Sequence, residues 1–428
     1  MKWFTVLFSL FIVAFSLNAT TSPELFRVRH DVVVKDDQWP STVTRVQPIE
    51  FNREAILSHD RGISSQAFVA QPTEFTFPVE GIEYTLVRDK FGFYKVEGAE
   101  WSSRVVDSED VVAGFLFLPD GEMWDITTRD GITYLAKHDY DAEVRNEMIV
   151  SSGVASSSKR RAVRHPANPN ACSGEWVETI DLAGIYNART LEWFSADPVV
   201  AERELRAYVE NAVDARNATV INTTGALLYK MRLVTLTKVS YADSGPNDPE
   251  GMGKALSWVV SSEEVKKILD QYQADAVHFF LGLYVVGPGG TASDKGRAVS
   301  SVTHSAFVFV HERGHADHLM LHDDKHDVVR EDRPIWAFDY YIDGVARGLM
   351  AYADNTNCPN GCPWQPIFAT PYRNYEGTNL PAGVRDVYEN WRMLEWTRGT
   401  VSMNNVIGNE NQCVASTGGF AMQKKSTF

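Results

Sequence analysis

Positive charge is scarce in this chain of 428 residues. Its 56 aspartates and glutamates outnumber 41 lysines and arginines, which leaves a formal net charge of −15 at pH 7. An acidic surface repels nucleic acids and anionic lipid headgroups alike. We therefore expect neither nucleic acid nor a membrane surface among the partners of this protein.

Long apolar runs are missing beyond the N-terminus. The best later candidate, residues 276–287, is shorter than the roughly 20 residues that a membrane-spanning helix needs. The N-terminus has Lys2, then apolar residues 3–17, then small or polar residues 18–20. This order is typical of a secretory signal peptide, residues 1–19. We expect a secreted, extracellular protein without membrane attachment after signal cleavage.

Cysteine is absent from the first 171 residues and occurs four times after them, at Cys172, Cys358, Cys362 and Cys413. Secretion into an oxidising compartment predicts disulfide bonds among them. Of the three possible connectivities, we favour Cys358–Cys362 with Cys172–Cys413. Sequons at Asn217 and Asn222 predict in addition a glycoprotein.

The composition is that of a globular protein. Hydrophobic residues make up 44% of the chain, which is enough apolar material for the cores of two domains. From residue 20 to about residue 147, short alternating segments separated by turns predict a small antiparallel β domain. Its expected strands are residues 74–78, 83–87, 92–96, 111–117, 123–127 and 132–136. Later, strands at 176–182, 229–240 and 276–286 alternate with helices at 198–217, 261–273 and 387–402. That alternation predicts a three-layer α/β domain.

A serine-rich stretch, residues 151–158, separates these halves and ends in Lys159, Arg160 and Arg161. A dibasic site in an exposed linker between two unlike halves of a secreted chain indicates proteolytic processing. The expected organisation is a signal peptide (1–19), a β-rich propeptide (20–161) and a second domain (162–428).

Five of the eleven histidines fall within residues 311–326. Because residues four apart share one face of a helix, His311 and His315 can bind one zinc ion while Glu312 projects beside it. Zinc lowers the pKa of a bound water to about 7, and a neighbouring carboxylate can then take its proton. The pattern predicts a zinc site with Glu312 as general base. By composition alone, residues 306–310 would form a strand.

A catalytic zinc usually has three protein ligands. Downstream of His315, His322-Asp323 completes a string that resembles the zinc signature of the metzincins, and Met350 in the segment 347–352 resembles their Met-turn. Further stretches are similar to reprolysin-like and peptidyl-Asp metalloendopeptidase domains: residues 176–186, 227–243, 366–374 and 390–401. The resemblance spans roughly residues 172–403.

The resemblance implies a metzincin-like catalytic domain of α/β (α+β) class in residues 162–428, with a mixed sheet, an active-site helix and a Met-turn. It implies a zinc metalloendopeptidase that is made as a zymogen and acts on proteins or peptides. Cleavage of a β-rich propeptide by a processing protease of the kexin or furin type is also usual in such families. Since the propeptide has no cysteine, a thiolate that blocks the zinc is excluded as its means of latency.

This sequence departs from the family pattern in one place. His318 stands where the family has glycine, and Leu321 stands at the position of the third histidine, so His322 comes one residue late. On a straight helix His322 would lie ~16 Å from His311 along the axis. We expect a break near Asp317 and His318, residue types that adopt left-handed backbone angles more often than most. His322 is then the third ligand, and His318 is its competitor.

The irregular turn motivates a second hypothesis, a catalytically inactive metzincin-like secreted protein that binds or inhibits. Retention of Glu312 favours the enzyme, because a module that only binds has no need of a general base.

Overall fold

The computed structural model describes residues 22–35, 39–53, 74–88, 93–108, 111–140, 178–227, 229–243, 245, 248, 250–282, 289–293, 296–318, 320–323, 335–352 and 357–394. The expected signal peptide, Arg160 and Arg161 of the linker, Cys172 and Cys413 lie outside these residues. None of the described helices has the length and apolar character that crossing a bilayer requires.

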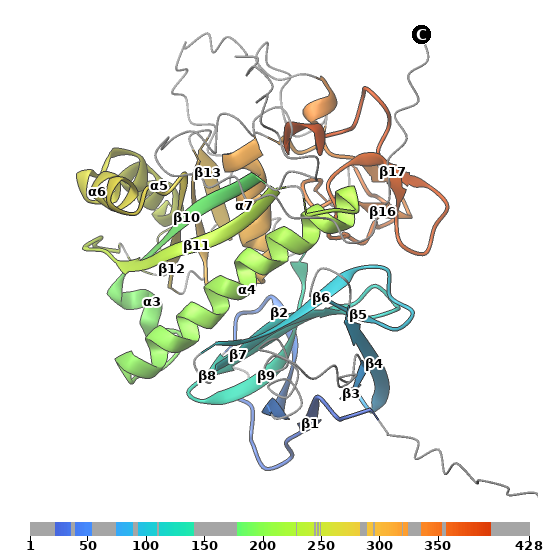
Figure 1. The fold of residues 1–428 in the computed structure, drawn as a ribbon, viewed down its shortest axis with the longest axis horizontal. Coiled ribbons are helices and arrows are strands. Elements are labelled where there is room, and N and C mark those ends of the chain that lie inside the picture. The colour runs from blue at the N-terminus through green and yellow to red at the C-terminus, as the bar shows by residue number, and fades with distance from the viewer. Residues whose placement is uncertain are drawn as a thin grey trace, which may run out of the picture.

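The N-terminal half is a single nine-stranded antiparallel sheet in the order β1-β2-β9-β8-β7-β6-β5-β4-β3 (Figure 1). Its strands are β1 Phe26–Val28, β2 Val43–Phe51, β3 Glu74–Val79, β4 Ile82–Arg88, β5 Tyr94–Val96, β6 Ser102–Ser108, β7 Val111–Phe117, β8 Met123–Arg129 and β9 Ile132–His138. The sheet curls almost to closure, since the N–H of Leu25, the residue before β1, donates to the Thr76 carbonyl of β3 (2.7 Å). Phe26, Phe75 and Trp124 pack in its interior.

All six expected strands of this half are present, with ends shifted by no more than two residues. Strands β1, β2 and β6 were not expected. Strand β6 reads Ser-Ser-Arg-Val-Val-Asp-Ser, so its sequence lacks the alternation that marks a half-buried strand. Its antiparallel pairing with β7 determines its position in the sheet.

The C-terminal half is built on a mixed five-stranded sheet in the order β11-β10-β12-β14-β13, with only β13 antiparallel to its neighbour. The strands are β10 Glu178–Tyr186, β11 Tyr229–Lys238, β12 Ala276–Leu281, β13 Gly290–Ser293 and β14 Arg297–Ser301. The helices are α3 Ala188–Glu192, α4 Pro198–Thr224, α5 Gly251–Ser261, α6 Glu263–Tyr272 and α7 Ala306–His318. Helices α5 and α6 share a core with one face of the sheet, and α4 and α7 share a core with the other, as a three-layer arrangement requires (Figure 1).

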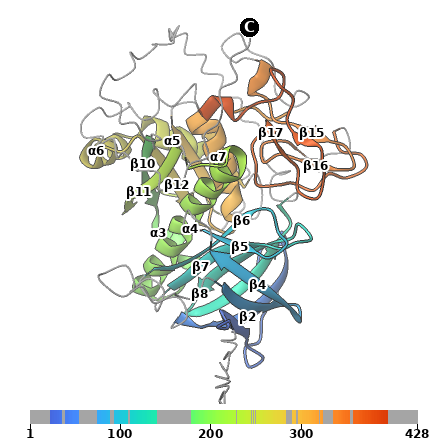
Figure 2. The same cartoon turned by 45° about the vertical axis from the view of Figure 1, so that its right-hand side comes forward.

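Helix α4, the longest, has clear start and stop signals. The Asp197 carboxylate accepts from the Val199 N–H (2.8 Å), Pro198 occupies the first turn, and Gly225 ends the helix with a φ of 77°. These are the cap residues that a helix of this length favours. In two views the helix runs between the C-terminal sheet and strands β6 and β7 of the N-terminal half (Figures 1 and 2).

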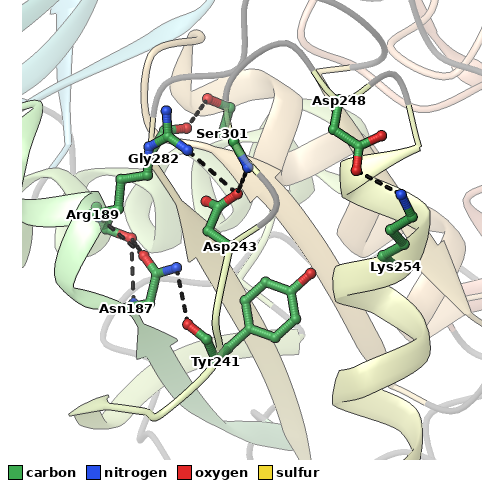
Figure 3. A network of polar contacts seen from close by, with 10 residues as sticks. Asn187, Arg189, Tyr241, Asp243, Asp248, Lys254, Gly282 and Ser301 are labelled. Carbon is green, nitrogen blue, oxygen red and sulfur yellow. Dashed lines mark hydrogen bonds and ion pairs between the residues drawn. The ribbon is translucent and has the colours of Figure 1, made fainter.

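Polar contacts fasten the loops at the carboxyl ends of the parallel strands (Figure 3). Arg189 forms an ion pair with Asp243 (3.6 Å), and the Ser301 hydroxyl donates to the Gly282 carbonyl (2.9 Å). This end of the sheet is thereby held together before the chain enters α7.

After α7 the chain forms short elements: a 3₁₀ turn at Ile335–Ala337, a hairpin of β15 Tyr341–Ile342 and β16 Ala346–Arg347, and a pair of β17 Thr370–Asn374 and β18 Pro381–Ala382. Cys358 and Cys362 form a disulfide, with Cα atoms 5.7 Å apart. The expected helix at 387–402 is wrong over residues 387–391, where Val384 bridges Tyr388 and the Glu389 N–H donates to the Trp336 carbonyl (3.0 Å).

Candidate metal centre

Three imidazoles from two segments meet at one point. His311 and His315 project from α7, and His322 follows the helix. The Nε2 atom of His322 lies 3.1 Å from that of His311 and 2.9 Å from that of His315. His311 and His322 are buried, and His315 is half-buried. The cluster has the geometry to hold a metal ion.

The cluster exists because helix α7 ends at His318. The chain then folds back, and the Met320 N–H donates to the Gly314 carbonyl (3.1 Å) one turn earlier in the helix. Leu321, the residue before His322, is buried and pairs with Phe338. The break therefore falls where we expected it, and it brings His322 back to the helix.

The expected left-handed residue is not found at Asp317, which keeps a negative φ. Its carboxylate accepts from Arg313 Nε (2.8 Å), four residues earlier, within the helix. Arg313 is fully buried and also donates to the carbonyls of Val277 (3.1 Å) and Gly296 (3.3 Å). Burial lowers the pKa of Arg313 to about 9. This ion pair fixes the last turn of α7 against the sheet.

Two of the imidazoles are oriented by backbone carbonyls. His311 Nδ1 lies 2.9 Å from the Leu349 carbonyl, and His315 Nδ1 lies 2.7 Å from the Met320 carbonyl. Because a carbonyl only accepts, each Nδ1 carries a proton, which leaves Nε2 as the ring nitrogen that can bind a metal ion. The donor set of three imidazole nitrogens fits zinc.

Glu312 is buried and packs against the edge strand β13. A Cβ added to Gly290 would lie 2.5 Å from its Cγ and 2.8 Å from its Oε1. The side chain runs along β13 only because position 290 has no side chain of its own. Glu312 thus stands next to His311 on the side of the helix that faces the edge of the sheet.

Met350 is fully buried and packs against helix α7. Its sulfur would lie 2.6 Å from a Cβ at Gly314, so α7 and the turn that holds Met350 pack as closely as a glycine permits. The buried Asp339 carboxylate holds the turn, accepting from the N–H groups of Met350 (2.5 Å) and Tyr340 (2.9 Å). Burial raises the pKa of Asp339 to about 7.

Sequence reasoning gave Asp339 no role, and no signal in the sequence marks it.

The ring of Tyr352, the last residue of the segment that resembles a Met-turn, stacks on the His322 ring with centroids 4.1 Å apart. Its N–H donates to the Asp323 carboxylate (3.3 Å). Both contacts fix His322 after the helix has ended.

The structure speaks against glycosylation at either sequon, because both asparagines are buried in α4. The Asn217 amide exchanges hydrogen bonds with the backbone of Met231 (3.0 and 2.8 Å). Asn222 accepts from the Ser102 N–H and donates to the Pro366 carbonyl, both at 3.2 Å. A glycan at either side chain would require the helix to leave its place.

No family model and no curated protein matches this sequence. Among solved structures, metalloproteinase-II from Bacteroides fragilis shares 12% identity with a TM-score of 0.38, over 81% of this chain and 96% of that chain. A chaperone–substrate complex shares 11% identity with a TM-score of 0.41, over 69% of this chain and 39% of that chain. Because both similarities are distant, the functional conclusion depends on the geometry of the histidine cluster.

Proposed function

We propose that the chain is a secreted zinc metalloendopeptidase, made as a zymogen and cut after Arg160 or Arg161 by a processing protease of the kexin or furin type. The observation that carries the proposal is the convergence of His311, His315 and His322 beside a buried Glu312. Three imidazoles leave one position of a tetrahedral ion open, as in catalytic rather than structural zinc sites.

The residues divide the work as follows. His311, His315 and His322 hold the ion, which when bound supplies Lewis acidity that activates water and polarises a carbonyl. Glu312 takes a proton from the attacking water and passes it to the departing amine as the C–N bond breaks. Met350 and Asp339 keep the base of the site rigid, so the imidazoles stay in place.

The substrate class follows from the strand beside Glu312. Strand β13 is the last strand of the five-stranded sheet. An extended peptide that adds to such an edge pairs through its backbone and carries a peptide bond past the carboxylate. Proteins or peptides in extended conformation are the substrates that this arrangement fits.

The test replaces Glu312 with Gln in the full chain, which is then cut after Arg161 so that the proposed latency is relieved before hydrolysis is measured. Zinc should stay bound, because Glu312 is not one of the three residues that hold the ion. Peptide hydrolysis should fall by about 10² to 10⁴-fold, because the general base is lost. Glu263→Gln, a change at an exposed carboxylate on α6, is the control and should leave hydrolysis unchanged. If the wild-type chain binds zinc but cleaves no extended peptide, the proposal of an enzyme is wrong. The second hypothesis, an inactive secreted protein that binds or inhibits, then takes its place.

A further inference from the structure

Helix α4 is covered on two sides, once by each half of the chain. Ala207 on this helix forms a buried cluster with Val111 and Ala113 of strand β7. Nearby, the Asn211 amide donates to the Gly114 carbonyl of β7 (3.2 Å). An alanine and an asparagine buried against a β-sheet imply that this face of the helix has evolved to be covered rather than to meet water.

Aromatic side chains of the N-terminal half also pack on the helix that carries the histidines. The ring of Phe307 in α7 lies 5.3 Å from that of Phe115 and 5.4 Å from that of Phe117, centroid to centroid. Phe307 lies one turn before His311. Trp364 joins the same cluster, 5.1 Å from Phe307 and 4.2 Å from the ring of Tyr140. Loss of the N-terminal half would expose large apolar rings beside the metal centre.

Buried polar groups of the C-terminal half find their partners in the N-terminal half. The Glu204 carboxylate accepts from the N–H groups of Asp130 (3.2 Å) and Gly131 (2.8 Å), and Asn222 accepts from the Ser102 N–H. Arg104 and Asp214 add an ion pair (2.8 Å). Separation of the halves would leave these groups without the partners that satisfy them.

One contact reaches the metal centre itself. The Tyr140 hydroxyl donates to the Leu349 carbonyl (3.4 Å), the same oxygen that accepts from His311 Nδ1. Tyr140 is fully buried, packed on Trp364, with the Arg347 guanidinium 5.8 Å from its ring. The N-terminal half therefore touches the carbonyl that orients the first histidine of the cluster.

We propose that the N-terminal β half is a permanent partner of the metal-bearing half, which cleavage at the linker nicks without releasing, and that Tyr140 is a positioning residue for His311. This goes beyond the proposed function, because it assigns the β half a lasting structural role. Phe115 and Phe117 cover the active-site helix, and Tyr140 braces the Leu349 carbonyl.

The first experiment tests the permanence of the partnership without reference to catalysis. A recognition sequence for a specific protease replaces residues 155–161, and the purified full chain is cut there. The two pieces should elute together in gel filtration as one particle of the size of the uncut chain. Elution as two separate species would overturn the proposal, whereas co-elution of a cut chain that hydrolyses no peptide would count only against the enzyme.

The second experiment tests Tyr140 through zinc affinity, measured by competition with a chelator in the uncut chain. Tyr140→Phe removes only the hydroxyl, so zinc affinity should fall about 3- to 10-fold, less than the 10- to 100-fold expected for a direct partner of a ligand. Tyr134→Phe, a change at a tyrosine of strand β9 in the same half, is the control and should leave zinc affinity unchanged. Equal zinc affinities in the two variants would overturn the role of Tyr140.

Discussion

Gly290 of strand β13 and Glu312 of helix α7 are in such close contact that a single added carbon would lie 2.5 Å from Glu312 Cγ. Because real Cβ atoms do not approach other atoms so closely, Gly290→Ala should displace the carboxylate and lower peptide hydrolysis by about tenfold or more. Zinc content should be unchanged, since the three histidines are untouched. Full activity in Gly290→Ala would show that the working base is not Glu312 in this position.

Glu204 links stability to pH at the contact between the halves. Burial raises the pKa of the Glu204 carboxyl from 4.5 to about 7. The N–H groups of Gly131 and Asp130 and the Arg129 charge lower this pKa, and the Asp130 charge raises it, but burial has the largest effect. Between these two values the folded chain binds more protons than the unfolded chain, so this group makes stability fall as pH rises from about 4.5 to about 7. Each unit of pKa shift corresponds to about 1.4 kcal/mol.

A glutamine side chain cannot ionise. Glu204→Gln should therefore make the free energy of unfolding less dependent on pH between about 4.5 and about 7. The measurement is urea unfolding of both proteins at several values between about pH 5 and pH 8. Asp339 and Glu376 have pKa values raised in the same direction, so the difference between variant and wild type is the quantity to compare. A difference that stays constant with pH would contradict the raised pKa of Glu204.

Asn222 should stabilise the fold and carry no glycan. Asn222→Ala leaves the Ser102 N–H and the Pro366 carbonyl without their partner in a buried place, which costs about 1–3 kcal/mol of unfolding free energy. Protein secreted from a glycosylating host should keep its mass on treatment with an endoglycosidase. A loss of mass assigned to position 217 or 222 would show that helix α4 is not buried as described.

The sequence predicted the strands of the N-terminal half well where apolar and polar residues alternate, as in residues 74–78. It did not predict β6, whose polar residues pair with β7 and pack against α4. The run Ala306–Val310 has the composition of a strand but is helical, because it is enclosed on all sides and Ser305 Oγ accepts from the Phe307 N–H at its start. Tertiary burial outweighs local propensity there.

Motif spacing located the histidine cluster, and the geometry of a straight helix predicted that the chain must break near Asp317 and His318. The sequence alone could not predict the roles of Leu321, Asp339 and Tyr140, because each role depends on a partner that is distant in the chain. Leu321 shows this most clearly: it looks like an insertion in a motif, but it is a buried residue paired with Phe338. Nor did the pattern of helix α4 indicate that a second sheet covers it.

The measurement that tests the central claim most directly is the zinc content and zinc affinity of the full chain and of two histidine variants. The wild-type chain should bind one zinc ion. His322→Ala should lose tight binding, because its Nε2 is the atom that both other imidazoles approach. His318→Ala should bind zinc as the wild type does, since the cluster is complete without it. A wild-type chain without zinc, or a His322→Ala variant with undiminished affinity, would contradict the account.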